Sequence, residues 1–289
     1  GGSTSFGVVI TVNDSAPSTL SYTSPNVFTK GVAIAPLSPS VSGGAVVSYS
    51  VSPALPLGLN FDTVSGMISG TPSVIAGSST YTVTAVNSGG STSFGVVITV
   101  NDSAPSTLSY TSPNVFTRGT TITNLNPSVL GGAVINYSIS PNLPTGLSFN
   151  SLSGVISGTP IVISDETLYK IIAANSGGTT SFDIQITVND IAPNTLSYAS
   201  PNVFTKDITI SNLAPFILGD IDNYSISPAL PLGLNFDTAS GVISGTPTSI
   251  VGTGNYTVTA TNSGGSTSFG IVITVNDSAP SSLSYTSPN

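Results

Sequence analysis

The side chains that could do chemistry in this 289-residue sequence are few, and most of them are carboxylates. The chain has 12 Asp and Glu residues, four Lys and Arg residues, and no Cys or His. Ser/His/Asp and Cys/His nucleophile arrangements are therefore excluded, as are zinc sites built from Cys and His. The remaining acids do not recur as a set: Asp165 and Glu166 lie in one part of the chain, and Asp207, Asp220 and Asp222 in another. We therefore expect no enzyme activity, because acid/base catalysis needs positioned titratable groups.

One acid does recur at regular intervals, and calcium is the cofactor that it could bind. It follows Val-Asn and precedes Ser-Ala-Pro or Ile-Ala-Pro, and its positions are Asp14, Asp102, Asp190 and Asp277. These segments resemble in part the Asn-Asp linkers of cadherin-like repeats, which bind calcium between domains. The acid expected upstream is missing, however, and calcium takes about six to eight oxygen ligands. The alternative to a junction calcium site is that each Asn-Asp pair forms an Asx-turn at a strand end.

Two three-residue patterns are candidates for modification. Asp-Ser-Ala and Asp-Thr-Val/Ala resemble the O-glycosylation motif of Bacteroidota, and the hydroxyl residues concerned are Ser15, Thr63, Ser103, Thr238 and Ser278. The same segments are also natural turns in a chain rich in Ser and Thr. Mass spectrometry of native material that found only unmodified peptides would reject the glycosylation hypothesis.

The charge balance excludes several classes of partner. The formal net charge is −8, and nucleic-acid binding needs clustered Lys and Arg to contact phosphates. The basic residues here are far apart in sequence, at Lys30, Arg118, Lys170 and Lys206. Anionic membrane surfaces are disfavoured for the same reason, and no apolar run approaches the roughly 18 residues that a membrane span needs.

The segment that carries the recurring aspartate belongs to a repeat that organises the whole chain. GGSTSFGVVITVNDSAPSTLSYTSPNVFT begins at Gly1 and returns unchanged at Gly89, and variants of it begin at Gly177 and Gly264. The successive spacings are 88, 88 and 87 residues. A period of this length is too long for a solenoid repeat and fits a whole β-domain of about 100 residues.

Each repeat is predicted to be a β-sandwich. Runs such as SFGVVITV, YTVTAVN and VVSYSV alternate between larger apolar residues and smaller or more polar ones, which is typical of half-buried strands. Ser-Gly and Asn-Ser-Gly-Gly turns separate these runs, and no segment has sustained helical spacing. With about seven strands per repeat, the chain is predicted to be all-β, an extended array of tandem Ig-like or cadherin-like antiparallel β-sandwiches.

The Ala-Pro segments that follow the recurring aspartate are predicted to be short, stiff linkers, since Pro restricts the backbone and donates no hydrogen bond. Boundaries are therefore placed after each of those aspartates. The predicted organisation is a last strand of a preceding truncated repeat at 1–14, three complete repeats at 15–102, 103–190 and 191–277, and a first strand of a following truncated repeat at 278–289.

The longest recurring motif is LPLGLNFDTVSGMISGTP at 55–72, which returns in variant form at 143–160 and 230–247. Leu55, Leu59, Phe61 and Ile68 are predicted to contact the core. The glycines at its two turns supply backbone angles that other residues resist, so the motif is predicted to fold as a β-hairpin between Phe61 and Ile68. The triple recurrence therefore indicates a folding device of each domain.

Together with the Tyr-x-Val-x-Ala-x-Asn run at 81–87 and 256–262, loosened to YKIIAAN at 169–175, this motif resembles the He_PIG family of Ig-like domains. The resemblance covers essentially the whole chain. It implies an Ig- or cadherin-like sandwich that occurs in tandem in large bacterial surface and secreted proteins, mostly as stalk or spacer. It implies no catalytic residues.

The leading functional hypothesis is a structural stalk or fibre segment of a large extracellular, adhesin-like bacterial protein, in which each sandwich acts as a rigid spacer. At a strand rise near 3.3 Å, three units should span on the order of 120 Å. The expected partners are neighbouring repeats of the same longer chain and, in a filament, other copies of it. The alternatives are a β-sandwich module that binds a carbohydrate or a protein, or a self-associating extracellular filament. The recurring Tyr and Phe residues are expected in the core, although an exposed row of them could bind glycans.

Overall fold

The alternating runs of the sequence form the two longest strands of each unit in a computed structural model, which describes residues 1–285. In the first unit these strands are β7 (Ala76–Asn87) and β8 (Gly90–Asn101). Along β7 the side chains of Tyr81, Val83 and Ala85 are buried, and the residues between them face outward, as a half-buried strand requires. The counterparts are β15 (Ser164–Asn175) and β16 (Gly178–Asn189), then β23 (Val251–Asn262) and β24 (Gly265–Asn276).

In each unit the two long strands form the centre of a four-stranded sheet, which in the first unit has the order β2-β8-β7-β4. β4 (Ser48–Ser52) pairs with β7 in antiparallel fashion, whereas β2 (Asn26–Thr29) runs parallel to β8. The parallel pair arises because the chain crosses between the two layers after β1 and joins the sheet beside its last strand. The equivalent outer strands are β10 (Asn114–Thr117) and β12 (Asn136–Ser140), then β18 (Asn202–Thr205) and β20 (Asn223–Ser227).

The opposite layer consists of two short antiparallel pairs. β1 (Pro17–Ser21) pairs with β3 (Ser40–Gly43), β5 (Leu59–Phe61) pairs with β6 (Ile68–Gly70), and a bridge between Leu37 and Ile68 connects the two pairs. The second unit repeats this layer with β9 (Pro105–Ser109), β11 (Ser128–Gly131), β13 (Leu147–Phe149) and β14 (Ile156–Gly158). The third unit has β17 (Asn194–Ser197), β19 (Phe216–Leu218), β21 (Leu234–Phe236) and β22 (Ile243–Gly245).

Each unit has its own hydrophobic core between its two layers. In the first unit Ile68 from one layer meets Val96 and Ile98 from the other, and none of the three is exposed to solvent. Burying one such side chain contributes roughly 1.5–3 kcal/mol. Because the three cores share no residue, the prediction of tandem Ig-like sandwiches is confirmed.

The recurring LPLGLNF…SGMISGTP motif folds as the predicted hairpin, in which Phe61 pairs with Ile68. Gly66 adopts a φ of +73°, and a Cβ there would lie 2.9 Å from the ring of Tyr49. The hydroxyl of Tyr22 donates a 2.6 Å hydrogen bond to the Gly66 carbonyl, and burial raises the pKa of this hydroxyl. Leu59 and Ile68 are buried, and Leu55 and Phe61 pack against the core, as predicted.

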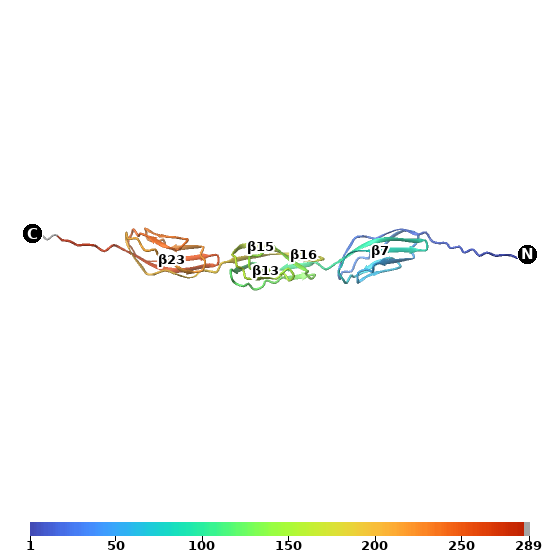
Figure 1. Ribbon diagram of the computed structural model, residues 1–289, viewed down its shortest axis with the longest axis horizontal. Coiled ribbons are helices and arrows are strands. Elements are labelled where there is room, and N and C mark those ends of the chain that lie inside the picture. The colour runs from blue at the N-terminus through green and yellow to red at the C-terminus, as the bar shows by residue number, and fades with distance from the viewer. Residues whose placement is uncertain (286–289) are drawn as a thin grey trace.

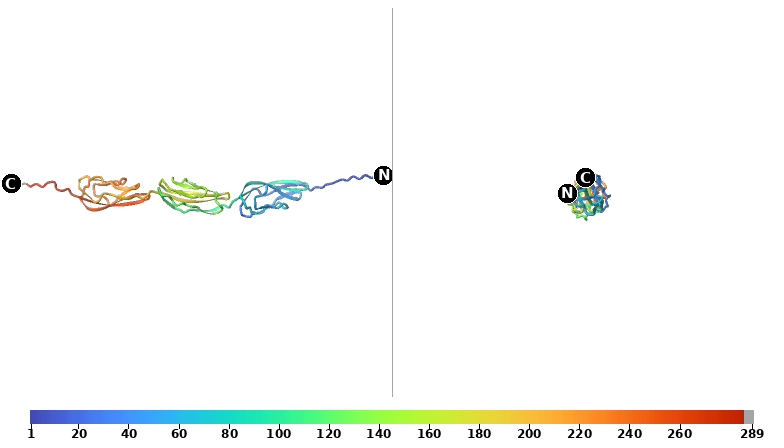
Figure 2. Two further views of the ribbon diagram at one scale, coloured as in Figure 1. Left: turned by 60° about the horizontal axis from the view of Figure 1, so that its bottom comes forward. Right: turned by 90° about the vertical axis from the view of Figure 1, so that its right-hand side faces the viewer.

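The three units follow one another in a line, and the segments 1–16 and 277–285 extend from opposite ends of this line (Figures 1 and 2). Seen along its long axis, the molecule has a compact outline (Figure 2, right). The predicted boundaries after Asp102 and Asp190 fall in the segments that connect the last strand of one unit to the first strand of the next. The described part of the chain contains no helix suited to crossing a membrane.

The strands predicted at the two ends of the chain are not formed. Residues 1–16 and 277–285 belong to no sheet, and residues 286–289 lie outside the described part of the chain. The segments at 1–14 and 278–285 therefore do not form the predicted strands in this structure, whereas their assignment to truncated neighbouring repeats stays a prediction. The physical reason is that a β-strand needs a hydrogen-bonded neighbour, and no strand among residues 1–285 pairs with either segment.

Candidate functional site at the unit junctions

The aspartate that leads into each unit is held by the hairpin turn of that same unit. The turn has the sequence Asn-Ser-Gly-Gly and connects the two long strands, as at 87–90 between β7 and β8. The backbone N–H of the aspartate donates to the serine hydroxyl of the turn. The pairs are Asp14 with Ser88 at 2.9 Å, Asp102 with Ser176 at 2.9 Å, and Asp190 with Ser263 at 2.8 Å.

The asparagine of the turn binds the linker and the turn at the same time. The Asn87 side-chain amide donates to the carbonyls of Ser15 (2.6 Å) and Ala45 (3.0 Å), and its oxygen accepts from the N–H groups of Gly89 and Gly90. Asn87 is buried, so a side chain without these partners would leave unsatisfied polar groups. Asn175 and Asn262 make the same four bonds in the second and third units.

The first glycine of the turn allows the linker backbone to lie directly against the turn. A Cβ on Gly89 would lie 1.9 Å from the carbonyl oxygen of Asp14, and a Cβ on Gly177 would lie 2.0 Å from that of Asp102. Gly264 has the same relation to Asp190, at 2.1 Å. Any other residue would push the linker away from the turn. We call these turns, 87–90, 175–178 and 262–265, the linker clamps.

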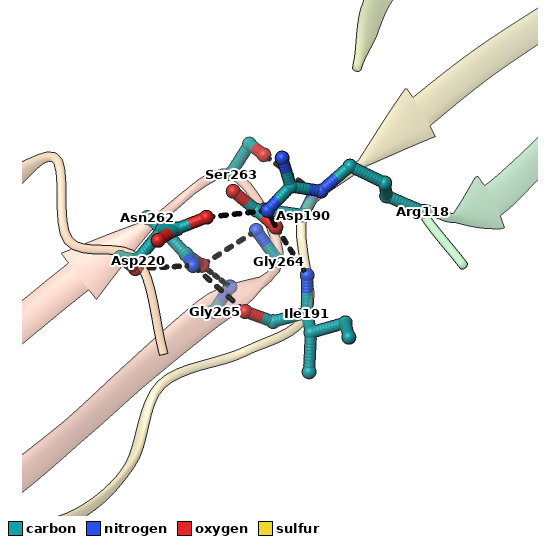
Figure 3. Close-up of polar contacts among 8 residues, drawn as sticks. All are labelled: Arg118, Asp190, Ile191, Asp220, Asn262, Ser263, Gly264 and Gly265. Atoms are coloured by element: carbon teal, nitrogen blue, oxygen red, sulfur yellow. Dashed lines mark hydrogen bonds and ion pairs between the residues drawn. The ribbon is translucent and has the colours of Figure 1, made fainter. Parts of the chain in front are cut away.

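The junction between the second and third units adds a cluster of charges to its clamp (Figure 3). The Arg118 guanidinium at the end of β10 lies 2.8 Å from a carboxylate oxygen of Asp190 in the linker. The same nitrogen donates to the carboxylate of Asp220 in the third unit. The hydrogen bond with Asp220 and the charge of Asp190 raise the pKa of Arg118, which therefore stays protonated. We call Arg118, Asp190 and Asp220 the ionic latch.

The first junction has the clamp without the latch. The Lys30 backbone N–H donates to the Asn101 carbonyl at 2.8 Å, as the Arg118 N–H does to that of Asn189. Ala133 takes the place of Asp220, because its carbonyl accepts from the clamp asparagine in the same way. Within residues 1–285, no carboxylate lies within 4.0 Å of the Lys30 ammonium group.

The four candidate calcium ligands lie apart, with Asp102 and Asp190 in the two junctions and Asp14 and Asp277 at the outer ends of the three units, and each has a partner from the protein. The Asp14 carboxylate accepts from Ser88, and the Asp190 carboxylate pairs with Arg118. Asp102 and Asp277 accept the N–H of the residue that follows them. Among residues 1–285, no three acids come together in a way that could hold a metal ion. A junction calcium ion remains a hypothesis. At Asp190, the guanidinium of Arg118 already neutralises the carboxylate that a calcium ion would need.

The five candidate glycosylation residues are exposed. Thr63 and Thr238 lie in hairpin turns, and Ser15 and Ser103 lie in linkers whose carbonyls the clamps hold. In the turn at Thr63, backbone N–H groups and Ser65 donate to the carboxylate of Asp62 and lower its pKa. Asn150 accepts the same backbone bonds in the second unit, so the acid is not required for the turn. Glycosylation remains a prediction.

The sequence analysis recognised Asn-Ser-Gly-Gly only as a turn. A signal for its role was present, because each of the first three Asn-Asp-x-Ala-Pro segments is followed by one such turn, with 74, 74 and 73 positions from the aspartate to the serine of the turn. Neither pattern predicts that the linker and the turn are in contact, because Asp14 and Ser88 are 74 positions apart in the sequence.

Comparison with known proteins places these units in one family. The family described as "Putative Ig domain" matches residues 8–101, 98–189 and 185–276. The serine-rich adhesin for platelets of Staphylococcus aureus is 33% identical over 153 residues, which are 49% of this chain and 6% of that protein. The same adhesin of strain MRSA252 is 32% identical over 49% of this chain and 11% of its own length. The chain thus spans a small part of the length of these relatives.

Two solved structures are similar to the chain along most of its length. The I-band fragment I67-I69 from titin covers 93% of this chain and 98% of its own, with 13% identity and a TM-score of 0.40. The N-terminal eight Ig domains of the Down Syndrome Cell Adhesion Molecule cover 92% of this chain and 36% of their own, with 14% identity and a TM-score of 0.43.

Proposed function

The chain belongs to this family of Ig-like domains, and from that premise we propose that it is a stiff spacer in an extracellular, adhesin-like bacterial protein. In this role the units carry other parts of a longer chain away from the cell surface. The relatives named as adhesins support the setting, and the junctions support the mechanical role.

The single observation that carries the proposal is the recurrence of the linker clamp. Each clamp ties the residues that lead into a unit to that unit by hydrogen bonds and by a close backbone contact, and two of the three clamps hold a linker between units. A linker held in this way has few rotatable bonds left, and Pro105 at the start of β9 removes another. Stiffness at every junction is what a spacer needs, because a flexible linker shortens the mean end-to-end distance of an array.

The edges of the four-stranded sheet favour a spacer over a filament formed by strand pairing. The edge strand β2 lies between Pro25 and Lys30, and its counterparts have the same flanks, Pro113 with Arg118 and Pro201 with Lys206. Proline and a charged residue at an edge oppose pairing with another chain. At the other edge, the N–H of Tyr49 in β4 already donates to the Thr63 carbonyl.

The aromatic residues also support a spacer. The Tyr and Phe residues that recur in each unit lie in the core or pack against it. Phe216 in β19 is the exposed aromatic within the units, and Ser40 takes its place in the first unit. A repeated aromatic surface for glycans is therefore not part of the three units as described.

An adhesion assay with cells that display the full-length protein tests the proposal. One variant deletes residues 103–190, and a second replaces them with an unrelated stiff Ig-like unit of equal length. We expect adhesion to fall with the deletion and to be restored by the replacement, because a spacer contributes length. Loss of adhesion in the equal-length replacement, with normal surface display, would show that the unit itself is the binding module.

A further inference from the structure

The two junctions differ in which units their contacts join. At the first junction, the linker hydrogen bonds described above go to the second unit, through Ser176 and Asn175. Within residues 1–285, no hydrogen bond or ion pair joins the strands and loops of the first unit directly to those of the second. The connection back to the first unit is the chain itself at Asn101–Asp102, where the Asn101 carbonyl accepts from the Lys30 N–H and the Asp102 N–H donates to Ser176. No side-chain hydrogen bond or ion pair between the two units, within residues 1–285, adds to these backbone bonds.

At the second junction, a side chain of the second unit contacts both the linker and the third unit. Arg118 belongs to the second unit, and its guanidinium pairs with the linker at Asp190 and with the third unit at Asp220. Rotation of the third unit about the linker would separate Arg118 from Asp220, and rotation of the second unit would separate it from Asp190. The Asp190 side chain is 10% exposed and the Asp220 side chain is 71% exposed, so water and salt screen the pair that reaches the third unit more strongly than the pair within the linker.

We propose that the ionic latch makes the second junction stiffer than the first, so that the array bends at the first junction, and that this difference depends on ionic strength. The inference rests on the proposed spacer function and deepens it, since it states where the spacer bends. Residue identity sets the difference: Lys30 and Ala133 stand in the first junction where Arg118 and Asp220 stand in the second. An Arg guanidinium has several N–H donors in a plane and serves two carboxylates, whereas a Lys ammonium acts as a compact point charge.

Distance distributions between paired spin labels measure the stiffness of each junction separately. The chain has no native cysteine, so two cysteines can be introduced without background labelling. Ser93, Ser181 and Ser268 are exposed residues at matching positions of β8, β16 and β24. The pair Ser93→Cys/Ser181→Cys spans the first junction, and the pair Ser181→Cys/Ser268→Cys spans the second.

At about 0.01 M salt we expect a narrower distribution across the second junction than across the first. At about 1 M salt the Debye length falls from about 30 Å to about 3 Å, and the second distribution should broaden toward the first. Arg118→Lys combined with Asp220→Ala gives the second junction the residues of the first and should remove the difference at low salt. Thermal unfolding of each variant checks that the units stay folded.

A variant that adds the latch to the first junction tests the proposal in the opposite direction. It should make that junction stiffer, which a misfolded unit would not do. Lys30→Arg combined with Ala133→Asp gives the first junction the residues of the latch, and its distribution should narrow at low salt and broaden at high salt. Equal, narrow distributions at both junctions, insensitive to salt and to both pairs of substitutions, would overturn the latch and leave the spacer function intact. Equal, broad distributions would overturn both.

Discussion

The interior of a unit and the junction between two units are held together by different interactions. In the interior, apolar side chains from two layers are fully buried, as for Ile68 and Ile98. At the junctions, the contacts are hydrogen bonds from a four-residue turn and, in one junction, two ion pairs. Because each unit buries its own apolar core, we expect each unit to be stable by itself. We expect the clamps to contribute mainly to the direction in which one unit follows another. Stability and stiffness should therefore respond to different substitutions.

The largest effect is expected from Gly66→Val, which changes the interior alone. The residue has a φ of +73°, and a Cβ would meet Tyr49 and Tyr22. Backbone strain and overpacking together should destabilise the first unit by about 2–5 kcal/mol. Amide hydrogen exchange should show lost protection in β7 and β8 and unchanged protection in β15 and β23. Loss of protection in all three units would mean that the cores are coupled.

A smaller effect on the interior is expected from Tyr110→Phe. The hydroxyl of Tyr110 donates to the Gly154 carbonyl at 2.6 Å in a buried position. Its removal leaves that carbonyl without this donor, which should cost about 1–3 kcal/mol in the second unit. Amide exchange in β15 and β16 measures the loss, and Tyr285→Phe, at an exposed tyrosine outside the units, serves as the matched control. Equal stability of the two variants would contradict the role of this bond.

A substitution in a clamp should separate stiffness from stability. In Gly177→Ala the new Cβ would lie 2.0 Å from the Asp102 carbonyl, so the linker must move. We expect the second unit to lose less stability than in Tyr110→Phe, because the linker segment that must move is outside the core and the turn is exposed. The label-to-label distribution across the first junction should broaden. Gly77→Ala, where a Cβ meets no atom within 4 Å, is the control.

The smallest effect is expected from Asp62→Asn, in an exposed turn. Hydrogen bonds from Val64 and Ser65 lower the pKa of Asp62 below its ordinary value of 3.8. This carboxylate therefore contributes stability above the unfolded pKa, and the contribution is lost as the pH falls through the lower, folded pKa. Asn accepts the same backbone bonds, as Asn150 does in the second unit, so we expect the variant to be only slightly less stable than the wild type near neutral pH. Its first unit should lack the fall in stability that protonation of Asp62 causes in the wild type at acid pH. Unchanged acid sensitivity of β7 exchange would contradict the assignment.

The sequence predicted the units better than the junctions. Strand alternation located β7 and β8, and the spacing of Gly66 and Ile68 located the hairpin, because these features depend on residues near one another in the chain. The linker clamp depends on contacts such as that between Ser15 and Asn87, which only the folded unit brings together. The ionic latch joins residues 102 positions apart, and the spacing of Arg118 and Asp220 carries no pattern that predicts it. The end strands were predicted because their sequences recur within the complete repeats, and recurrence does not report whether a partner strand lies beside them.

Small-angle X-ray scattering of the wild-type chain beside Gly177→Val/Gly264→Val tests most directly whether the clamps keep the units in line. The two substitutions place side chains against the linker carbonyls of Asp102 and Asp190 and leave the cores unchanged. We expect rod-like scattering from the wild type, with the three units spanning on the order of 120 Å. We expect a shorter mean dimension and a broad ensemble from the variant, with amide protection of the cores retained. Wild-type scattering that already indicates freely jointed units, or a variant that is equally rod-like, would contradict the account.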